Sequence, residues 1–543
     1  MEERTTIEWD KDDLNALGIL KIDVLGLGML SCIQKAFRLL YQHHKCDVDL
    51  TTIPAEDPAV YNMLCKADTL GVFQVESRAQ MTMLPRLKPR NFYDLVVEVA
   101  IVRPGPIQGN MVHPYLRRRN GQEKITFPSE ALRHVLGRTY GVPLFQEQAM
   151  KIAIVAAGFT PDEADGLRRA MATFRRVGTI HQYRDKMIQG MIKYGYEKEF
   201  AERCFNQIEG FGEYGFPESH AASFALLVYT SSWLKCHYPA IFACALLNSQ
   251  PMGFYASAQI IRDAREHGVI VYPPDVNFSL WDCKIELNEN GTDAVRLGLR
   301  QIRGLGEKMA HELVSIRDSG NGRPFSSIHD FVQRCPFPKR VLQLLAGADT
   351  FGSMNLSRRE ALWKIHRANP IQMPLFRDSG EVITEPNVIL PIMAPGEEVI
   401  HDYHTLQLSL KAHPLELLRR DMGKISVVKI QQLKKIENNS NVSIAGLVIT
   451  RQRPSTANGV IFITLEDETG TANAIIWPST FERYKIETLF AKLLLIRGKL
   501  QREGIIIHII ANHLIDMTSD LYALAKNSNN KISQSNYLSR DFK

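Results

Sequence analysis

The spacing of apolar residues changes along this chain of 543 residues, and the change restricts the folds that the chain can adopt. From about Thr51 to His267, apolar residues recur at the spacing of helices, with short Gly- and Pro-rich interruptions. From about Ser426 onward, apolar and polar residues alternate as they do in half-buried strands. The sequence therefore predicts a multidomain protein that is mainly α-helical and carries a β-barrel in its C-terminal part.

The N-terminal segment has a different pattern. Its apolar stretch from Leu17 to Leu27 is rich in β-branched residues and lies within Leu14–Leu40, which predicts a strand followed by a helix. Asp23 would lie at the end of that strand, where a carboxylate can project into a cleft. Without further information, an aspartate in such a place is more often a capping or solvated residue.

The helical stretch contains one well-marked helix start. Thr160 can serve as the N-cap, Pro161 suits the first helical position, and Glu163 can return a hydrogen bond to the cap. The helix that follows presents Arg168 and Arg169. Paired arginines on a helix are usually a solvated face.

A glycine-rich turn lies between two helical patterns farther along the chain. The stretch Leu297–Leu313 predicts a helix, a hairpin at Gly304 and Gly306, and a second helix, with Arg303 and Lys308 beside the turn. Glycines let the backbone approach a phosphate closely, and the amides of a helix N-terminus hold the anion without reading base sequence. We predict a helix-hairpin-helix DNA-binding region, with a plain αα-hairpin as the alternative.

The alternating stretches between residues 442 and 498 predict a small five-stranded barrel of the OB-fold type. Such barrels commonly bind single strands on a basic and aromatic face, for which Arg451, Arg453, Phe462 and Trp477 are the candidates. The alternative is that these aromatic residues belong to the core. Residues 366–425 are rich in proline and predict a linker, and the polar stretch 526–536 predicts a disordered tail.

The composition permits DNA binding without requiring it. Sixty-five Lys and Arg residues against 59 Asp and Glu residues give a formal charge of +6, so local clusters must make any contact with a polyanion. The eight cysteines form no C-x-x-C pair, which argues against a zinc ribbon or a disulfide framework. The N-terminus has no signal-peptide pattern and no apolar run has membrane length, so we expect a soluble, cytoplasmic protein.

Six longer motifs occur along the chain: Leu20–Leu27, Leu70–Ser77, Val102–Pro106, Phe145–Gln148, Leu167–Met171 and Tyr214–His220. Together they resemble the bacterial C-family DNA polymerases, the family of the DNA polymerase III α subunit. Within that family, Trp9–Asp13, the Pro217-Glu218 pair and Ser539–Phe542 are similar to the error-prone, damage-inducible branch more than to the replicative α subunit.

The resemblance implies a domain order. It places the C-terminal part of an α/β palm at residues 1–55, helical fingers at 56–270, the helix-hairpin-helix region at 271–365, the linker at 366–425, the OB-fold at 426–516 and a tail at 517–543.

The resemblance also implies a chemistry. Nucleotidyl transfer needs carboxylates that hold two Mg²⁺ ions and cations that neutralise a triphosphate. By resemblance, Asp23 is the catalytic, metal-binding candidate, one of three palm aspartates. The nucleotide-binding candidates are Lys21, Arg103, Arg168, Arg169, Tyr214 and His220. Local packing remains the alternative for Tyr214 and His220, and a rigid turn remains the alternative for Arg103.

The predicted linker contains the peptide Gln372-Met-Pro-Leu-Phe376, which resembles a sliding-clamp-binding motif. In such a motif Gln372 would hydrogen-bond at the rim of a pocket while Leu375 and Phe376 fill an apolar cleft. The expected partners are primed template DNA, deoxynucleoside triphosphates, the sliding clamp and other damage-response accessory proteins, with no membrane partner.

The sequence departs from the family's pattern in one respect. Family members carry a phosphoesterase-like domain and two further palm aspartates before the motif at Lys21, and this sequence has no counterpart of them. One metal ligand out of three cannot build a two-metal site, so we expect this polypeptide alone to be an inactive part of an error-prone DNA-directed DNA polymerase. The alternative is a non-catalytic module that binds DNA and the sliding clamp.

Overall fold

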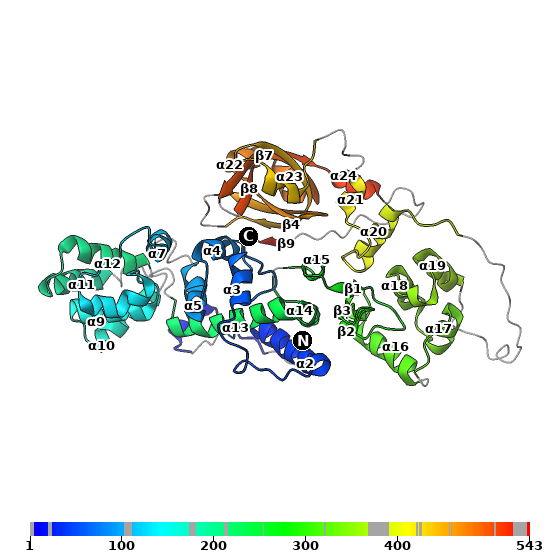
Figure 1. Ribbon diagram of the computed structural model, residues 1–543, viewed down its shortest axis with the longest axis horizontal. Coiled ribbons are helices and arrows are strands. Elements are labelled where there is room, and N and C mark those ends of the chain that lie inside the picture. Colours follow the sequence, from blue (N-terminus) through cyan, green and yellow to red (C-terminus); the bar gives the residue numbers. More distant parts are fainter. Residues whose placement is uncertain are drawn as a thin grey trace, which may run out of the picture.

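The computed structural model describes residues 5–19, 24–102, 111–172, 181–210, 216–253, 255–319, 322–367, 390–419, 422, 426–454, 457, 459–503, 506–524 and 540–542. Figure 1 shows helices at the left and centre, a small sheet with further helices at the right, and a barrel above the centre. This order along the chain agrees with the predicted change from helical to alternating periodicity.

Helix α13 (Glu218–His237) lies at the centre of the helical part. Its neighbours are α2 (Leu27–His44), α3 (Pro58–Cys65), α5 (Phe92–Ile101) and α14 (Pro239–Leu247), and α4 (Arg78–Leu87) packs against α3 and α5. The packing of α13 against α5 is the most extensive helix–helix contact, and every residue of α5 from Asp94 to Ile101 is buried. Helices that are apolar on nearly all sides are buried on all sides, which explains why both run through the interior.

The N-terminal segment differs from the prediction. Its helix is confirmed as α2, and α1 (Lys11–Ala16) is an additional short helix. Leu17–Ile19 and Val24–Gly26 form no strand, and residues 20–23 lie outside the described residues. A strand needs a neighbour for its ladder of hydrogen bonds, and no described segment lies alongside as one.

The left-hand lobe in Figure 1 is built from the described elements that follow α5. They are α7 (Val112–Arg119), α8 (Glu130–Leu136), η1 (Gly137–Thr139), α9 (Gln146–Ala157), α10 (Pro161–Ala172), α11 (His181–Lys193) and α12 (Lys198–Gly210). The predicted cap at the start of α10 is confirmed: Glu163 N–H donates to Thr160 Oγ1 at 3.3 Å, and Thr160 N–H donates to a Glu163 carboxylate oxygen at 3.1 Å.

After α15 (Ser257–Glu266) a small sheet precedes the next helices. Its strands are β1 (Ile270–Tyr272), β2 (Lys284–Leu287) and β3 (Asp293–Arg296), in the order β1-β3-β2, with β1 parallel to β3. Four helices and two 3₁₀ turns follow: η2 (Leu299–Gln301), α16 (Glu307–Ser319), α17 (Ile328–Arg334), α18 (Lys339–Gly347), η3 (Gly352–Met354) and α19 (Arg358–Arg367).

The prediction of a helix from Leu297 up to the glycine hairpin was wrong. That stretch holds only the 3₁₀ turn η2, because β3 extends to Arg296 and Gly298 has an extended backbone. The second predicted helix is confirmed as α16.

The predicted linker at 366–425 contains structure. It includes α20 (Pro395–Thr405) and α21 (Pro414–Leu418), so the prediction of a loose connection was wrong for these parts. The guanidinium of Arg358 on α19 is fully buried and forms ion pairs with Asp402 and Glu398 of α20. These contacts fix α20 against α19, although residues 368–389 between the two helices lie outside the described residues.

The C-terminal barrel is confirmed. Five strands, β4 (Asn441–Gln452), β5 (Ile461–Asp467), β6 (Gly470–Ile476), β7 (Leu493–Glu503) and β8 (Ile506–Asp516), run in the order β5-β6-β8-β7-β4, and β4 pairs with β5 to close the ring. The 3₁₀ turn η6 (Ile430–Lys435) precedes the barrel, and α22 (Pro478–Arg483) and α23 (Lys485–Phe490) lie between β6 and β7. The predicted tail contains α24 (Thr518–Ala523) and β9 (Arg540–Phe542), while 526–536 lies outside the described residues.

Among the described helices, none is both long and apolar enough to cross a membrane. All eight cysteines are unpaired. Burial raises the pKa of the Cys32 and Cys204 thiols to about 12, so both stay protonated and chemically inert at neutral pH.

Candidate functional site

The predicted site residues divide into those that the structure describes and those that it does not. Lys21, Asp23, Arg103, Tyr214, Gln372, Leu375 and Phe376 lie outside the described residues. The described candidates are Arg168, Arg169 and His220 in the helical part, the residues of the glycine turn, and the barrel residues.

Two motifs far apart in the sequence meet at the N-terminus of α13. Phe145 pairs with Phe216 in a parallel bridge, and Gln146 N–H donates to the Phe216 carbonyl at 3.2 Å. A carboxylate oxygen of Glu147 accepts a hydrogen bond from Glu218 N–H at 3.0 Å. An acceptor at this position satisfies one of the backbone N–H groups that a helix N-terminus leaves open. The first turn of α9 therefore positions the first turn of α13.

A row of rings leads from this junction along α13. The His220 ring lies 5.0 Å from the Phe216 ring and 4.2 Å from the Phe224 ring, centroid to centroid, and Phe224 meets Phe73 edge-on at 5.1 Å. Phe73 N–H donates to Ser231 Oγ of α13 at 3.2 Å. The row thus joins Tyr214–His220 to Leu70–Ser77.

The far end of the row reaches the N-terminal segment. A Cβ added to Gly26 would stand 3.4 Å from the Phe73 ring, which is closer than most such contacts. Gly26 belongs to the motif Leu20–Leu27 and lies three positions after Asp23, which is outside the described residues. Three motifs separated by long stretches of sequence are therefore in contact around α13.

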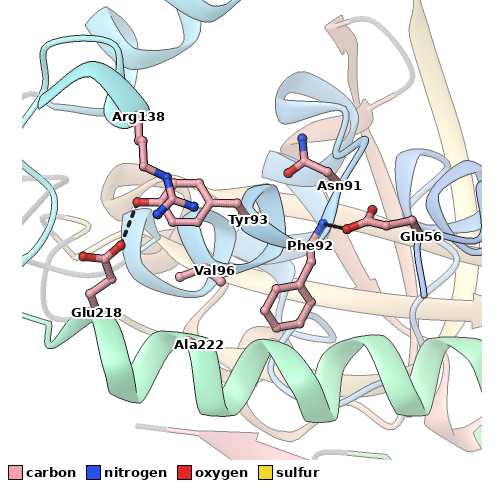
Figure 2. Close-up of a pocket in the computed structure, with 8 residues that line it drawn as sticks. All are labelled: Glu56, Asn91, Phe92, Tyr93, Val96, Arg138, Glu218 and Ala222. Atoms are coloured by element: carbon pink, nitrogen blue, oxygen red, sulfur yellow. Dashed lines mark hydrogen bonds between the residues drawn. The ribbon is translucent and has the colours of Figure 1, made fainter. Parts of the chain in front are cut away.

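A pocket of about 500 Å³ opens beside the N-terminus of α13 (Figure 2). The Tyr93 hydroxyl donates to Glu218 at 2.9 Å, and the Arg138 guanidinium lies 3.8 Å above the Tyr93 ring. Burial, and then the hydrogen bond to Glu218, raise the pKa of Tyr93 above its ordinary value, so the phenol stays a donor. Glu56 closes the other side by accepting from Phe92 N–H at 3.0 Å. The pocket therefore combines an exposed cation, an aromatic face and a carboxylate on α13.

Arg168 and Arg169 each form an ion pair with a residue of their own helix, α10. Arg168 and Arg169 both form ion pairs with Asp165, at 2.8 and 2.7 Å. The hydrogen bond from Arg168 is the main cause that lowers the pKa of Asp165. Both side chains remain substantially exposed, so they can exchange this carboxylate for a phosphate. Their contact with a triphosphate stays a prediction.

The glycine turn presents backbone and positive charge to solvent. Arg303, Gly304, Gly306 and Lys308 are all exposed, and Gly304 has a φ of 84°, which few other residues adopt without strain. Arg303 N–H donates to the Thr405 carbonyl at 2.8 Å, which ties the turn to the C-terminal end of α20. A phosphate can therefore approach this turn without displacing side chains.

The candidate DNA-binding residues of the barrel differ in their exposure to solvent. The prediction for Arg451 was wrong, because its side chain is buried and Nε donates to the Thr488 carbonyl at 2.6 Å, while Nη2 donates to the Ala491 carbonyl. Arg451 therefore closes the barrel against α23. Arg453 and Trp477 are exposed, and Arg453 lies 5.5 Å from the Phe481 ring. Arg453 and Trp477, together with the half-buried Phe462 on β5, remain candidates for contact with a single strand.

One cluster of the described residues has ligand atoms close enough together for a metal ion: Asp68, Asp263 and His267. It already contains a cation, since the buried Lys235 ammonium lies 2.9 Å from Asp68 and 2.8 Å from Asp263. Burial opposes ionisation of Asp68, but His267 and Lys235 hold its pKa down to about 2, and the bond to Asp68 raises the pKa of His267 to about 9. Two cations balance two carboxylates, so the cluster is an internal ion-pair network.

Sequence reasoning missed Glu147, Tyr93 and Arg138 as residues of the site. Glu147 stands inside the quoted motif Phe145–Gln148, so its place in that motif was a usable signal. Nothing in the local sequence marks Tyr93 or Arg138, because their role depends on how α5 and the end of α8 meet α13.

Three segments of the chain match family models of known proteins. The family model of the bacterial DNA polymerase III alpha subunit finger domain matches residues 29–195. A helix-hairpin-helix motif matches 268–361, and an OB-fold nucleic acid binding domain matches 442–516.

Similar proteins bear the name error-prone DNA polymerase. Those of Sinorhizobium medicae and Brucella abortus are each 54% identical over 97% of this chain, which corresponds to 49% and 50% of their own lengths. That of Ruegeria pomeroyi is 54% identical over 98% of this chain and 48% of its own length. The chain spans about half the length of the curated relatives it matches.

Proposed function

This chain belongs to the bacterial DNA polymerase III α-subunit family, and on that premise we propose that it forms the fingers, helix-hairpin-helix and barrel part of an error-prone DNA-directed DNA polymerase. The proposed reaction is template-directed nucleotidyl transfer in damage-induced synthesis across lesions. The observation that carries the proposal is the meeting of three distant motifs around α13, through Glu147, Phe73 and Gly26. Residues that only stabilise a fold have no need to converge on one helix beside an open pocket.

The proposed site for the nucleotide lies along the N-terminal half of α13. His220 would face the sugar and Tyr214 the base, while Lys21, Arg103, Arg168 and Arg169 would neutralise the triphosphate. Supporting this, His220 stands between Phe216 and Phe224 with its ring held in place.

The family implies two Mg²⁺ ions, with Asp23 as a ligand in this chain. The described residues offer no fit for such an ion, because their one suitable cluster is filled by the Lys235 ammonium. We therefore assign no catalytic step to a metal ion here. We propose that this polypeptide by itself does not extend a primer.

An exposed apolar surface supports that view. Leu17, Val24, Leu25 and Leu27 are each more than half exposed, and Leu30 adds to the same stretch. Soluble proteins rarely leave so many neighbouring large apolar side chains uncovered, so this stretch fits a surface that another polypeptide part covers. That part would supply the remaining metal-binding carboxylates.

A single-nucleotide primer-extension assay tests the activity. The polypeptide alone, with primed DNA and Mg²⁺, is expected to give no extension. Extension should appear when the half of the Sinorhizobium medicae relative that lies outside the match is added, and Asp23→Asn should remove it. Extension by the polypeptide alone that Asp23→Asn abolishes would contradict the proposed inactivity.

The second candidate function is a non-catalytic module that binds DNA and the sliding clamp. The exposed turn at Gly304 and Gly306, which needs no catalytic partner, favours it. Addition of the unmatched half of the Sinorhizobium medicae relative distinguishes the two functions, because a module stays silent in the extension assay while it still binds primed DNA.

The clamp is the proposed protein partner in both cases. The peptide Gln372–Phe376 supports this by its resemblance to clamp-binding motifs. Calorimetry with the purified clamp should show binding by the wild type and none by the Leu375→Ala/Phe376→Ala variant. Equal affinity of both proteins would rule out this peptide.

A further inference from the structure

The outer face of three neighbouring barrel strands carries side chains suited to a single strand of DNA. Phe462 on β5, Asn473 on β6 and His508 on β8 lie between core positions such as Ile461 and Ile509, so they point outward. Asn473 pairs in register with both Thr464 of β5 and His508 of β8, so the three strands present one continuous surface. OB barrels commonly bind single strands here, with bases stacked on an aromatic ring.

A residue from the helical part covers this surface. Arg78, the first residue of α4, places its guanidinium carbon 4.3 Å from the centre of the Phe462 ring. Its Nη2 lies 3.2 Å from Nδ1 of His508, at hydrogen-bond distance. Figure 1 shows the barrel above α4, in agreement with this contact. One side chain therefore meets both the aromatic ring and the imidazole of the outer face.

The contact leaves Arg78 incompletely satisfied. Its Nη1 is buried and has no hydrogen-bond partner, and burial lowers the pKa of its guanidinium to about 10. A buried donor without a partner weakens the state that buries it. The contact of Arg78 with the barrel is thus stabilised by stacking on Phe462 and by the hydrogen bond to His508. The loss of water from Nη1 destabilises the same contact.

The barrel has a second, different attachment to the helices. Arg262 of α15 forms an ion pair with Glu466 at the end of β5, at 2.5 Å, and Glu466 is almost fully buried. Breaking a buried ion pair costs more than separating a guanidinium from a ring. The Arg262 side can therefore stay attached while the Arg78 side opens.

We propose that Arg78 occupies the stacking position of a DNA base on Phe462, so that a single strand can bind this face only when Arg78 leaves. A guanidinium is planar and stacks on an aromatic ring as a base does, and both require the same face of Phe462. Once released, Arg78 gains water or a phosphate oxygen for Nη1. The inference rests on the proposed DNA-binding function of the barrel and assigns it a closed state.

Binding of single-stranded DNA to the whole polypeptide tests the proposal. The probe is a fluorescein-labelled oligodeoxythymidylate of about 16 nucleotides, read by anisotropy at constant salt. Arg78→Ala should tighten binding about threefold to tenfold, the range of a stacking contact of this kind. Removal of a positive charge ordinarily weakens binding to DNA, so the expected sign is opposite to that of plain electrostatics. The matched control Lys88→Ala removes an exposed charge at the other end of α4 and should weaken binding slightly or leave it unchanged.

Two further variants separate the proposal from its premise. Phe462→Ala should weaken binding, and adding Arg78→Ala to it should restore nothing. If Phe462→Ala binds like the wild type, the barrel face does not bind single strands and the proposed DNA-binding function of the barrel fails. If Phe462→Ala weakens binding but Arg78→Ala weakens it too or leaves it unchanged, the barrel binds DNA and the closed state is wrong.

Hydrogen exchange gives a readout that does not depend on affinity or on the stability of the variants. On addition of the oligonucleotide to the wild-type chain, β5 amides should become more protected while the first turn of α4 becomes less protected. Increased protection of both segments would mean that DNA bridges them without displacing Arg78, which overturns the proposal.

Discussion

Replacement of Lys235 by methionine tests how the central helix α13 is held. The Lys235 side chain is 1% exposed and contacts Asp68 at 2.9 Å, Asp263 at 2.8 Å and the Leu70 carbonyl at 3.2 Å. Methionine keeps much of the shape and removes the charge. The variant would leave two carboxylates facing each other with only His267 as a cation.

The expected loss can be worked out from these contacts. Removal of one partner of a buried ion pair costs about 3–5 kcal/mol. Asp68 keeps its bond to protonated His267 at 2.7 Å and is one-third exposed to water, so most of the loss falls on Asp263. We therefore expect the free energy of local opening of α13 to fall by about 3 kcal/mol, the lower end of that range.

Local hydrogen exchange of the α13 amides is the assay, because the chain has several domains and a single unfolding free energy is not defined for it. Burial already raises the pKa of Asp263, and without the ammonium that carboxyl takes up a proton more readily. The loss should therefore shrink at pH 5, with about 1.4 kcal/mol recovered for each pH unit by which the pKa of Asp263 in the variant lies above pH 5. The control Lys198→Met, at an exposed i,i+4 pair with Glu202, should change stability by less than about 0.5 kcal/mol. A loss at Lys235→Met that is under about 1 kcal/mol, or that is equal at pH 5 and pH 7.5, would refute the reasoning.

Three further predictions concern the same chain. Since the pKa of His267 is raised to about 9, its contribution is full below pH 6.5 and lost as pH rises through 9, so wild-type protection of α15 should fall by about 3 kcal/mol over that range and His267→Gln should abolish the fall. The double variant Arg303→Ala/Lys308→Ala should lower duplex DNA affinity and reduce the slope of log K against log salt by about 2, whatever the DNA sequence. Arg451→Ala should destabilise the barrel by at least about 2 kcal/mol, read from hydrogen exchange of the β4 amides, whereas Arg453→Ala should leave that protection unchanged and weaken binding of single strands.

The parts of the fold that the sequence predicted well have strong local signals. Alternation of apolar residues predicted the barrel because each strand buries one face, and the closed ring of β4 to β8 agrees with it. The cap at Thr160 was predictable because its hydrogen bonds form within one turn. The helix α20 also had its signals, Pro395 at the first position and Glu397 and Glu398 in the first turn, but the surrounding prolines obscured them.

Arg451 shows what alternation cannot predict. Val448 points into the core, so strict alternation would turn Arg451 outward. A bulge between Val448 and Thr450 shifts the register and reverses the faces that follow. The guanidinium then meets the carbonyls of Thr488 and Ala491 instead of solvent. A bulge depends on the partner strand, so the local sequence did not reveal it.

The candidate site depends even more on long-range packing. The motifs suggested by resemblance which residues matter, but not which of them touch. Glu147 reaches Glu218 over 71 positions and Arg78 reaches His508 over 430. Such pairs follow from the arrangement of whole helices and domains, and a charged residue in a sequence does not specify its partner.

Helix α13 is held differently at its two ends, and this difference bears on how the candidate site moves. Toward its C-terminus, Lys235 is enclosed by two carboxylates and a backbone carbonyl. At its N-terminus, Glu218 N–H donates to Glu147 and the Tyr93 hydroxyl donates to the Glu218 carboxylate, in a part-buried environment beside the open pocket. Such bonds contribute about 1 kcal/mol each, well below the cost of breaking the buried ion pairs. Opening of α13 should therefore begin at Glu218 and His220 while the Lys235 end stays fixed, so that the end of the helix that faces the proposed nucleotide is the end free to adjust to it.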